Sequence, residues 1–435
     1  MNPLIDFPST PHKALAFDRI KPEHFLPALE HWIQVSKERQ AAIVANSEAP
    51  TFENTVAALE FSSLELNKVS SCFFNLNSAE TNDAIQEIAR EFSPKLTAFS
   101  SETLLNEPLF LRIESVYESG QELDSAEAKR LLNETYESFV RNGAALEGED
   151  RARLTALNEE LSTLSLTFGE HVLAETKAFQ YHTVATQDLQ GLPEDVIEAA
   201  AQQGQEQGKE GYVLGLDMPT YMAVMKYADR SELRSHFYRA YGSRAVKENE
   251  NNNEQVIKNL VNKRMERAQL LGFDSHAQLT LSKRMAKTPG TVLNFLDHLL
   301  EVAKPAAERD LKAVTDFAAA EGADLPIQPW DFSYWSEKLK MERLALDDQA
   351  LKPYFKLENV LQGAFTVAGR LFGLHFKHHP DVSIYHEDVD AYEVFDADGN
   401  FLSLFYADFF PRAGKRAGAW MTNYQSMYTK EDTEV

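Results

Sequence analysis

Apolar residues recur three and four positions apart along most of the chain before Pro380, and this spacing is the strongest constraint on the fold. On an α-helix, residues at these intervals lie on one face, so the pattern predicts amphipathic helices. One long example runs from Glu149 to about Lys177 and carries Leu154, Leu157, Leu161, Leu164 and Phe168. We interpret this stripe as a core seam between antiparallel helices, with a coiled-coil partner surface as the alternative.

A few residues mark where predicted helices begin and end. Asp124 followed by Glu127 has the form of a capping box, and Asn142-Gly143 has the form of a left-handed helix stop. Thr288-Pro289 predicts the start of another helix, which Pro305 is expected to kink or break because proline lacks a backbone N–H.

After about residue 380 the pattern changes to short β-prone runs. Residues 392–394 and 401–405 are separated by Asp396-Ala-Asp-Gly-Asn400, which supplies the left-handed position of a tight hairpin turn. Two further strand-like pieces are Gly211–Asp217 and Gly418–Met421. The sequence therefore predicts a mainly α fold with a small antiparallel β-sheet near the C-terminus.

A polar segment rich in glycine, Gln187 to Gly211, interrupts the helical pattern. We place a joint between two lobes there. Residues 1–190 are predicted to form an N-terminal helical lobe, and residues 191–435 a second helical region followed by the small sheet.

The chain is strongly acidic, with 67 Asp and Glu against 43 Lys and Arg, a formal charge of −24. Phosphate binding needs clustered cations, so this balance argues against nucleic acids and anionic membranes and permits charged or basic peptides as partners. No apolar run is long enough to cross a bilayer, and the first twenty residues carry no secretion signal. Because Cys72 is the single cysteine, we expect a cytoplasmic protein.

Three histidines, His375, His378 and His379, lie within five residues. Neutral imidazole is a common zinc ligand, so metal binding is one interpretation. However, Gly373 is expected to end the preceding helix, and no carboxylate or cysteine stands at a matching ligand spacing. We therefore favour a solvated loop.

The run Tyr385-His-Glu-Asp-Val-Asp390 offers an imidazole and carboxylates for acid–base chemistry. Alternation along a strand divides them between two faces, which favours a structural role, with a substrate-facing role for His386 or Asp390 as the alternative. Residues 396–400 are not followed by the further ligands and the terminal Glu that a twelve-residue calcium-binding loop requires. The basic stretch Arg412–Gly418 lacks the spacing of a phosphate-binding loop.

Motifs for nucleophilic or zinc catalysis are absent from the sequence. There is no Gly-x-Ser-x-Gly, and none of the twelve histidines belongs to a His-Glu-x-x-His. Cys72 lies in an apolar run without a basic neighbour, so we expect a buried thiol. These residues by themselves give no complete catalytic site.

Three segments near the C-terminus carry a specific resemblance. Asp388–Asp396, Phe405–Asp408 and Arg412–Trp420 resemble, in order and spacing, the segment that leads into the active site of the thimet oligopeptidase and oligopeptidase A family. The resemblance covers essentially the whole chain through the shorter motifs Leu371–Phe376, Trp330–Trp335, Lys283–Ala286, Arg267–Phe273 and Thr51–Thr55. Where relatives more often have Trp, this chain has Tyr385.

The resemblance implies an enzyme, a zinc metallopeptidase with two mostly helical lobes and a deep channel that admits short peptides. Zinc in this family is held by the two histidines of His-Glu-x-x-His and by a Glu on a following helix, and the motif Glu activates the metal-bound water. No residue of this chain matches these positions. We therefore carry over no catalytic residue and no metal ligand, and we expect zinc in the full-length family member but none bound by this chain.

We thus predict the N-terminal part of a cytoplasmic zinc-dependent oligopeptidase that hydrolyses short peptides, with the chain alone inactive. The alternative is a non-catalytic peptide-binding or protein-interaction module that has lost the zinc-binding third. Arg412, Lys415 and Arg416 are candidates for orienting peptide carboxylates, with structural ion pairs as the alternative. His386 is the fourth candidate for substrate binding. The sequence predicts no oligomeric state.

Overall fold

The computed structural model of the chain describes residues 1–120, 122–123, 125–144, 146, 148–430 and 433–434. Its α-helices are α1 (Phe25–Ala45), α2 (Ala58–Glu60), α3 (Leu64–Ala79), α4 (Asp83–Leu104), α5 (Glu107–Glu118), α6 (Ala126–Arg141), α7 (Gly148–Ala178), α8 (Glu194–Glu206), α9 (Met218–Tyr227), α10 (Ser231–Gly242), α11 (Glu254–Leu270), α12 (His276–Leu281), α13 (Pro289–Ala320), α14 (Phe332–Leu344), α15 (Asp348–Leu351) and α16 (Leu357–Phe372). Its strands are β1 (Tyr181–Thr183), β2 (Tyr212–Leu214), β3 (His375–His378), β4 (Val389–Phe395), β5 (Phe401–Asp408), β6 (Thr429–Lys430) and β7 (Thr433–Glu434). Short 3₁₀ or π-helical segments are η1 (Pro11–Lys13), η2 (Phe17–Arg19), η3 (Pro22–His24), η4 (Phe52–Ala57), η5 (Phe61–Ser63), η6 (Thr186–Leu189) and η7 (Lys352–Tyr354).

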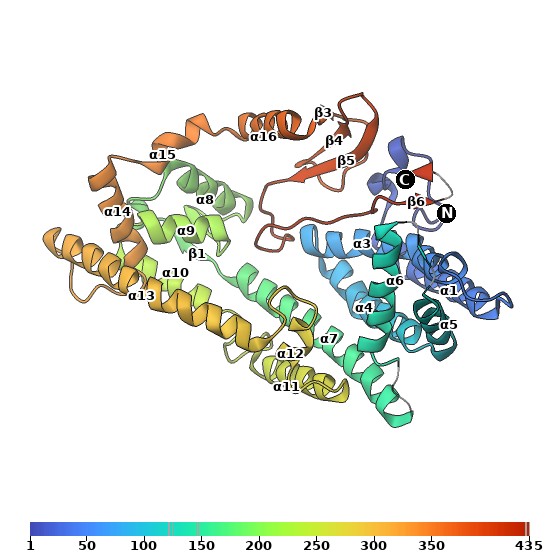
Figure 1. Cartoon of the computed structure of the whole chain (residues 1–435). Coiled ribbons are helices and arrows are strands. Elements are labelled where there is room, and N and C mark those ends of the chain that lie inside the picture. The colour runs from blue at the N-terminus through green and yellow to red at the C-terminus, as the bar shows by residue number, and fades with distance from the viewer. Residues whose placement is uncertain (121, 124, 145, 147, 431–432, 435) are drawn as a thin grey trace.

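The elements run around a central space in Figure 1. Helices α7 and α13 lie along the bottom of the view, and α15, α16 and the strands β3–β5 lie along the top. The N-terminal helices α1 and α3–α6 stand at one side, and α8–α10 with α14 stand at the other. The predicted mainly helical fold with a small antiparallel sheet near the C-terminus is confirmed.

Helices α1, α3 and α4 enclose the N-terminal apolar core. Phe25, Phe73 and Phe92 are fully buried there, and the rings of Phe73 and Phe92 stack with their centroids 4.2 Å apart. The predicted burial of the Cys72 thiol is confirmed, and that burial raises its pKa to about 12. This thiol is therefore unreactive at neutral pH.

Helix α7 confirms the long helix predicted from its leucine stripe. It packs against α4 and α11, and Leu154 and Leu157 are fully buried in that seam. Further along the same stripe Phe168 is exposed. The first half of the stripe thus belongs to the core, whereas Phe168 at its end does not.

A second apolar core joins α8, α9 and α10 to the two-stranded sheet β1–β2. The strand predicted near residue 213 is confirmed as β2, and its antiparallel partner β1 was not predicted. Leu214 on β2, Val224 on α9 and Phe237 on α10 are buried together. Because β1 continues directly from α7, this second core is anchored to the end of the long helix.

The C-terminal sheet has the strand order β3-β4-β5, with both pairs antiparallel. The predicted hairpin between β4 and β5 is confirmed: Asp396 accepts hydrogen bonds from the turn, and Gly399 has φ of +84°. Helix α16 covers the sheet through Phe365, whose ring stacks on Phe376 of β3 at 4.1 Å. The left-handed Gly373 ends α16 as expected.

Two expectations about the C-terminal part are wrong. Residues His375–His378 form strand β3 and not a loop, because their backbone pairs with β4 from His375 opposite Phe395 to His378 opposite Tyr392. Residues Gly418–Met421 form no strand in the part of the chain that the structure describes.

Two predicted helix boundaries also need correction. Helix α13 runs without interruption from Pro289 to Ala320, so Pro305 does not break it. Because proline has no backbone N–H, the helix lacks one backbone hydrogen bond at this residue. Helix α6 begins with Ser125 as its cap, since the Ser125 hydroxyl accepts the N–H of Ala128. The predicted cap, Asp124, lies outside the described residues. No helix in the described ranges is both long and apolar enough to span a lipid bilayer.

Candidate functional site

A cavity of about 2410 Å³ lies between the long helix α7 and the C-terminal sheet. Its wall comes from the second half of α7, from α8, from the turn before α9, from β5 and from residues 409–427. In Figure 1 the segment that follows β5 runs through the central space. Pockets for small molecules are typically ~300–1,000 Å³, so this cavity has room for an extended peptide.

The charged side chains of the cavity wall are mostly basic. Among the described residues that line it, seven are Lys or Arg, namely Lys13, Lys68, Lys177, Arg244, Arg412, Lys415 and Arg416, and three are Asp, namely Asp195, Asp217 and Asp408. The whole chain has the opposite balance, with a formal charge of −24. A cavity that gathers one sign of charge concentrates ligands of the other sign, which here means carboxylates.

Asp408, the last residue of β5, organises the chain that follows the sheet. Arg412 donates to both carboxylate oxygens of Asp408 at 2.8 Å, and also to Glu80 Oε2 and the Ala79 carbonyl oxygen at 2.9 Å. The Lys415 ammonium donates to Asp408 Oδ1 at 2.8 Å and to two backbone carbonyl oxygens at 2.9 Å. All three side chains in this network are about nine-tenths buried.

This network decides what Arg412 and Lys415 can do. An ammonium has three N–H donors, and each of those of Lys415 already has an acceptor. Arg412 uses four of its five donors, two of them in a bidentate pair with Asp408. Both side chains therefore lie at the cavity wall, yet they are engaged in the structural ion pairs that the sequence left open as the alternative to substrate binding.

The pKa values of the network follow from these contacts. Burial opposes ionisation of Asp408, but the hydrogen bonds from Arg412, Lys415 and Tyr385 outweigh it and lower the pKa of Asp408 to about 2. The hydrogen bond to Asp408 raises the pKa of Arg412. Burial, followed by the hydrogen bond to Asp408, raises the pKa of the Tyr385 phenol. At neutral pH Asp408 is thus ionised and Tyr385 is a neutral donor.

A close backbone approach holds the loop after β5 against the end of α3. The Thr81 N–H donates to the Gly414 carbonyl oxygen at 2.9 Å, and the Arg416 N–H donates to the Ser78 carbonyl oxygen at 2.7 Å. A Cβ atom at Gly414 would lie 2.5 Å from the Thr81 carbonyl oxygen, so only glycine permits this contact. The loop therefore presents the side chain of Arg416 from a fixed backbone.

Arg416 differs from the other two candidate cations. Its side chain is exposed at the cavity, and its guanidinium lies over the ring of Trp420, 4.9 Å from the centroid. Within the described part of the chain its guanidinium has no acidic partner. Arg416 is thus free to pair with the carboxylate of a ligand.

The fourth sequence candidate, His386, lies away from these cations. It is not part of the described cavity wall, and its Nδ1 accepts the backbone N–H of Asp388 at 3.1 Å, in the turn before β4. The other candidate of that run, Asp390, pairs instead with His378 at 3.2 Å on the exposed face of the sheet. The structure therefore brings Arg412, Lys415 and Arg416 together and leaves His386 apart from them.

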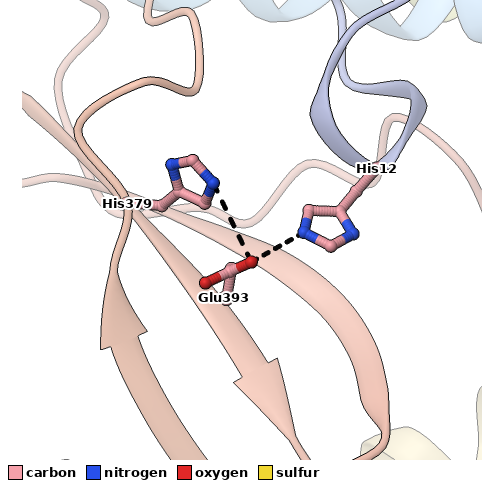
Figure 2. Close-up of side chains that lie close together, drawn as sticks. All are labelled: His12, His379 and Glu393. Carbon is pink, nitrogen blue, oxygen red and sulfur yellow. Dashed lines mark hydrogen bonds and ion pairs between the residues drawn. The ribbon is translucent and has the colours of Figure 1, made fainter.

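A separate group of possible ligands lies beside the sheet, where His12, His379 and Glu393 meet (Figure 2). His12 and Glu393 were not predicted as ligands from the sequence. A signal was present for Glu393, because alternation along β4 places it on the same face as the buried Val389 and Ala391, where a carboxylate needs a partner. No sequence signal pointed to His12, which is far away in the chain.

This group does not fit the zinc site that the family resemblance implies. That site needs two histidines on one helix, whereas His12 lies in the 3₁₀ turn η1 and His379 follows strand β3. The described residues hold no other cluster of three or more possible ligands that converge in this way. No hydrolytic step can be derived from these residues.

The chain is similar to known peptidases. Residues 224–434 match peptidase family M3. Over 99% of its length the chain is 36% identical to the dipeptidyl carboxypeptidase of Salmonella typhimurium, and over 100% it is 35% identical to that of Escherichia coli. Oligopeptidase A of Escherichia coli is 32% identical over 99% of the chain. The chain spans 64% of the length of each of these relatives.

Proposed function

The chain belongs to peptidase family M3, and on this premise we propose that it forms the peptide-binding part of a zinc-dependent oligopeptidase that acts on short peptides. The observation that carries the proposal is the basic cavity in an otherwise acidic protein. A short peptide with free termini has its C-terminal carboxylate at one end and its N-terminal ammonium at the other, so cations at one part of the cavity can bind the carboxylate end. The cavity would hold such a ligand by its charge and exclude folded proteins by its size.

Both predicted parts of the chain would contribute to this site. Residues 1–190 contribute α7 and the N-terminal segment around Lys13, and residues 191–435 contribute α8, β5 and the loop with Arg416. The division of the chain into two lobes stays a proposal, since strand β1 in the first part pairs with β2 in the second. A ligand in the cavity would contact both parts.

Within this site we assign the recognition of a peptide carboxylate to Arg416. A guanidinium can donate two parallel hydrogen bonds to one carboxylate, and Arg416 has its donors available. Trp420 holds the guanidinium plane from one side. Arg412 and Lys415 would support the loop and would not touch the peptide.

Peptide binding by the chain gives the direct test. We expect the exchange Arg416→Gln to raise the Kd for a short peptide with a free C-terminus about tenfold, which corresponds to ~1.4 kcal/mol for one charge-assisted contact. The same exchange should change the Kd little for a peptide whose C-terminus is amidated. Fluorescence anisotropy of labelled peptides measures both.

Arg239→Gln is a matched control for that exchange. Arg239 is also exposed and lies over a tryptophan, Trp330, at 5.0 Å, but it is outside the cavity wall. We expect its removal to leave peptide binding unchanged. An equal loss of peptide affinity in Arg416→Gln and Arg239→Gln would contradict the role of Arg416. So would an equal loss of affinity of Arg416→Gln for the free and the amidated peptide.

We further propose that the 435 residues do not hydrolyse peptides by themselves and that the protein works in the cytoplasm. The sequence contains no His-Glu-x-x-His, and the group at His12 does not replace it. A buried single thiol suits a reducing compartment. Purified chain should leave a quenched fluorescent peptide intact with and without added zinc. Hydrolysis that survives controls for contaminating proteases would overturn this part of the proposal.

A further inference from the structure

The three side chains in Figure 2 face one another, and His12 comes from the N-terminal segment whereas His379 and Glu393 belong to the C-terminal sheet region. His12 Nε2 lies 2.7 Å from Glu393 Oε1, and His379 Nε2 lies 3.9 Å from the same oxygen. One ligand atom from each residue fits within 4.8 Å of the other two. Ligands bound to one metal ion lie within such distances of each other.

The local structure holds each of these side chains in place. The ring of His12 stacks on Phe401 of β5, with 3.7 Å between the centroids, and the His379 N–H donates to the Ala391 carbonyl oxygen at 2.9 Å. His12 has φ of +52° and Lys13 has φ of +57°, left-handed conformations that are uncommon for residues other than glycine. The turn that brings His12 to Glu393 therefore contains two consecutive residues in this conformation.

The buried atoms of the group have too few partners. Glu393 is 7% exposed, and its Oε2 atom accepts no hydrogen bond among the described residues. The nearest cation to that oxygen is Lys377 at 3.6 Å, whose own side chain is largely in solvent. The Nδ1 atom of His379 is likewise buried without a hydrogen-bond partner in the described chain. A buried carboxylate that has so few hydrogen bonds and ion pairs favours the binding of a cation beside it.

We propose that His12, His379 and Glu393 bind one divalent transition-metal ion of the class represented by Zn²⁺, Co²⁺ and Ni²⁺. Two imidazole nitrogens and one carboxylate oxygen suit these ions, whereas Ca²⁺ and Mg²⁺ require oxygen ligands. Binding replaces the hydrogen bond between His12 and Glu393 by two bonds to the metal. His12 then carries its ring proton on Nδ1, so that Nε2 is free to bind the ion, and water completes the coordination. None of the three residues belongs to a His-Glu-x-x-His motif.

Such an ion would join the N-terminal segment to the sheet. His12 lies in η1, whereas Glu393 lies in β4, and both His12 and its stacking partner Phe401 line the cavity. The metal would therefore fix one wall of the cavity. We expect metal binding to raise the melting temperature of the chain, because it stabilises only the folded state.

The test uses the untagged chain after treatment with a chelator. Isothermal titration with Zn²⁺, in the presence of excess Mg²⁺ to occupy acidic surface sites, should show one saturable site per chain. A rise of roughly 3 °C in the melting temperature is expected at a hundredfold excess over Kd. Absorption of the Co²⁺ form should report a low-coordinate nitrogen and oxygen environment.

Three variants and one control locate the site. Glu393→Gln keeps the shape of the side chain, and His12→Asn suits the left-handed backbone, so both should fold. We expect each of them, and His379→Gln, to weaken Zn²⁺ binding by more than about tenfold. His378→Gln removes the neighbouring exposed histidine and should bind as the unchanged chain does.

Loss of binding in the three variants but not in His378→Gln supports the proposal. Absence of a saturable site in the unchanged chain overturns it, and so does Zn²⁺ binding that His12→Asn and Glu393→Gln leave intact. If one variant is unfolded by circular dichroism, the other two decide. Peptide binding is measured separately, so failure of this proposal is distinguishable from failure of the proposed function.

Discussion

Replacement of Asp408 by asparagine is expected to lower the free energy of unfolding by about 3–5 kcal/mol, because it leaves the buried Lys415 without a counter-ion and the buried Arg412 with Glu80 alone. Arg412 and Lys415 both converge on this carboxylate, and their side chains are only 9% and 10% exposed. Asparagine has a similar shape but no charge, so the loss is electrostatic and not steric. Urea unfolding monitored by circular dichroism gives the change.

An exposed ion pair provides the control. Asp316 pairs with Lys312 at 2.6 Å, but both side chains are mostly in solvent. Exposed pairs contribute about 0–1 kcal/mol, so Asp316→Asn should change stability little. Equal effects of the two exchanges would show that the network at the cavity wall is not a stabilising one.

The pH dependence of stability gives an independent measure of the same carboxylate. The folded-state pKa of Asp408 is lowered to about 2, below the usual unfolded value of ~3.9. The contribution of ionised Asp408 to the free energy of unfolding is therefore complete above pH ~4 and disappears as the pH falls through ~2. A difference of this size corresponds to roughly 2.5 kcal/mol. The Asp408→Asn variant should lose less stability between pH ~4 and pH ~2 than the unchanged chain does. An equal loss of stability in both proteins over this range would contradict the lowered pKa of Asp408.

Features set by neighbouring residues could be predicted from the sequence. The leucine spacing predicted α7, the turn residues 396–400 predicted the hairpin, and Gly373 predicted the end of α16. Each of these depends on contacts within a few residues, which propensity and periodicity describe. Pro305 shows the limit even here, because α13 continues through this residue where local preference predicts a kink or break.

Features set by distant residues could not be predicted. The strand β3 forms because β4 pairs with it, and the pairing of His375 with Phe395 cannot be read from the histidine cluster itself. The same holds for the candidate site. Three cations near residue 415 were recognised, but only the contacts of Asp408 separate the engaged Arg412 and Lys415 from the available Arg416.

A motif that served only to recognise the family also has a structural role. In the segment Trp330–Trp335, Asp331 pairs with Arg234 of helix α10. Two guanidinium nitrogens of Arg234 lie 2.5 and 3.2 Å from Asp331 Oδ1, and a third donates to the Ala228 carbonyl oxygen at 2.6 Å. The guanidinium also lies over Tyr334 at 4.1 Å. This buried pair joins α10 to the start of α14.

We expect Arg234→Met to lower the free energy of unfolding by about 3–5 kcal/mol, as large an effect as that at Asp408. Methionine fills part of the volume but leaves Asp331, which is 8% exposed, as an unpaired buried charge. Urea unfolding measures the change. The exposed Arg239 on the same helix is the matched control, and Arg239→Gln should cost less than about 1 kcal/mol.

A double variant distinguishes the ion pair from simple loss of packing. When Asp331→Asn is added to Arg234→Met, no unpaired charge remains, so the second exchange should cost much less than it does in the unchanged chain. The interaction energy from this cycle should therefore be about 1–3 kcal/mol. Strictly additive costs would mean that Arg234 stabilises the contact between α10 and α14 through its stacking on Tyr334 and its carbonyl contacts, and not through Asp331.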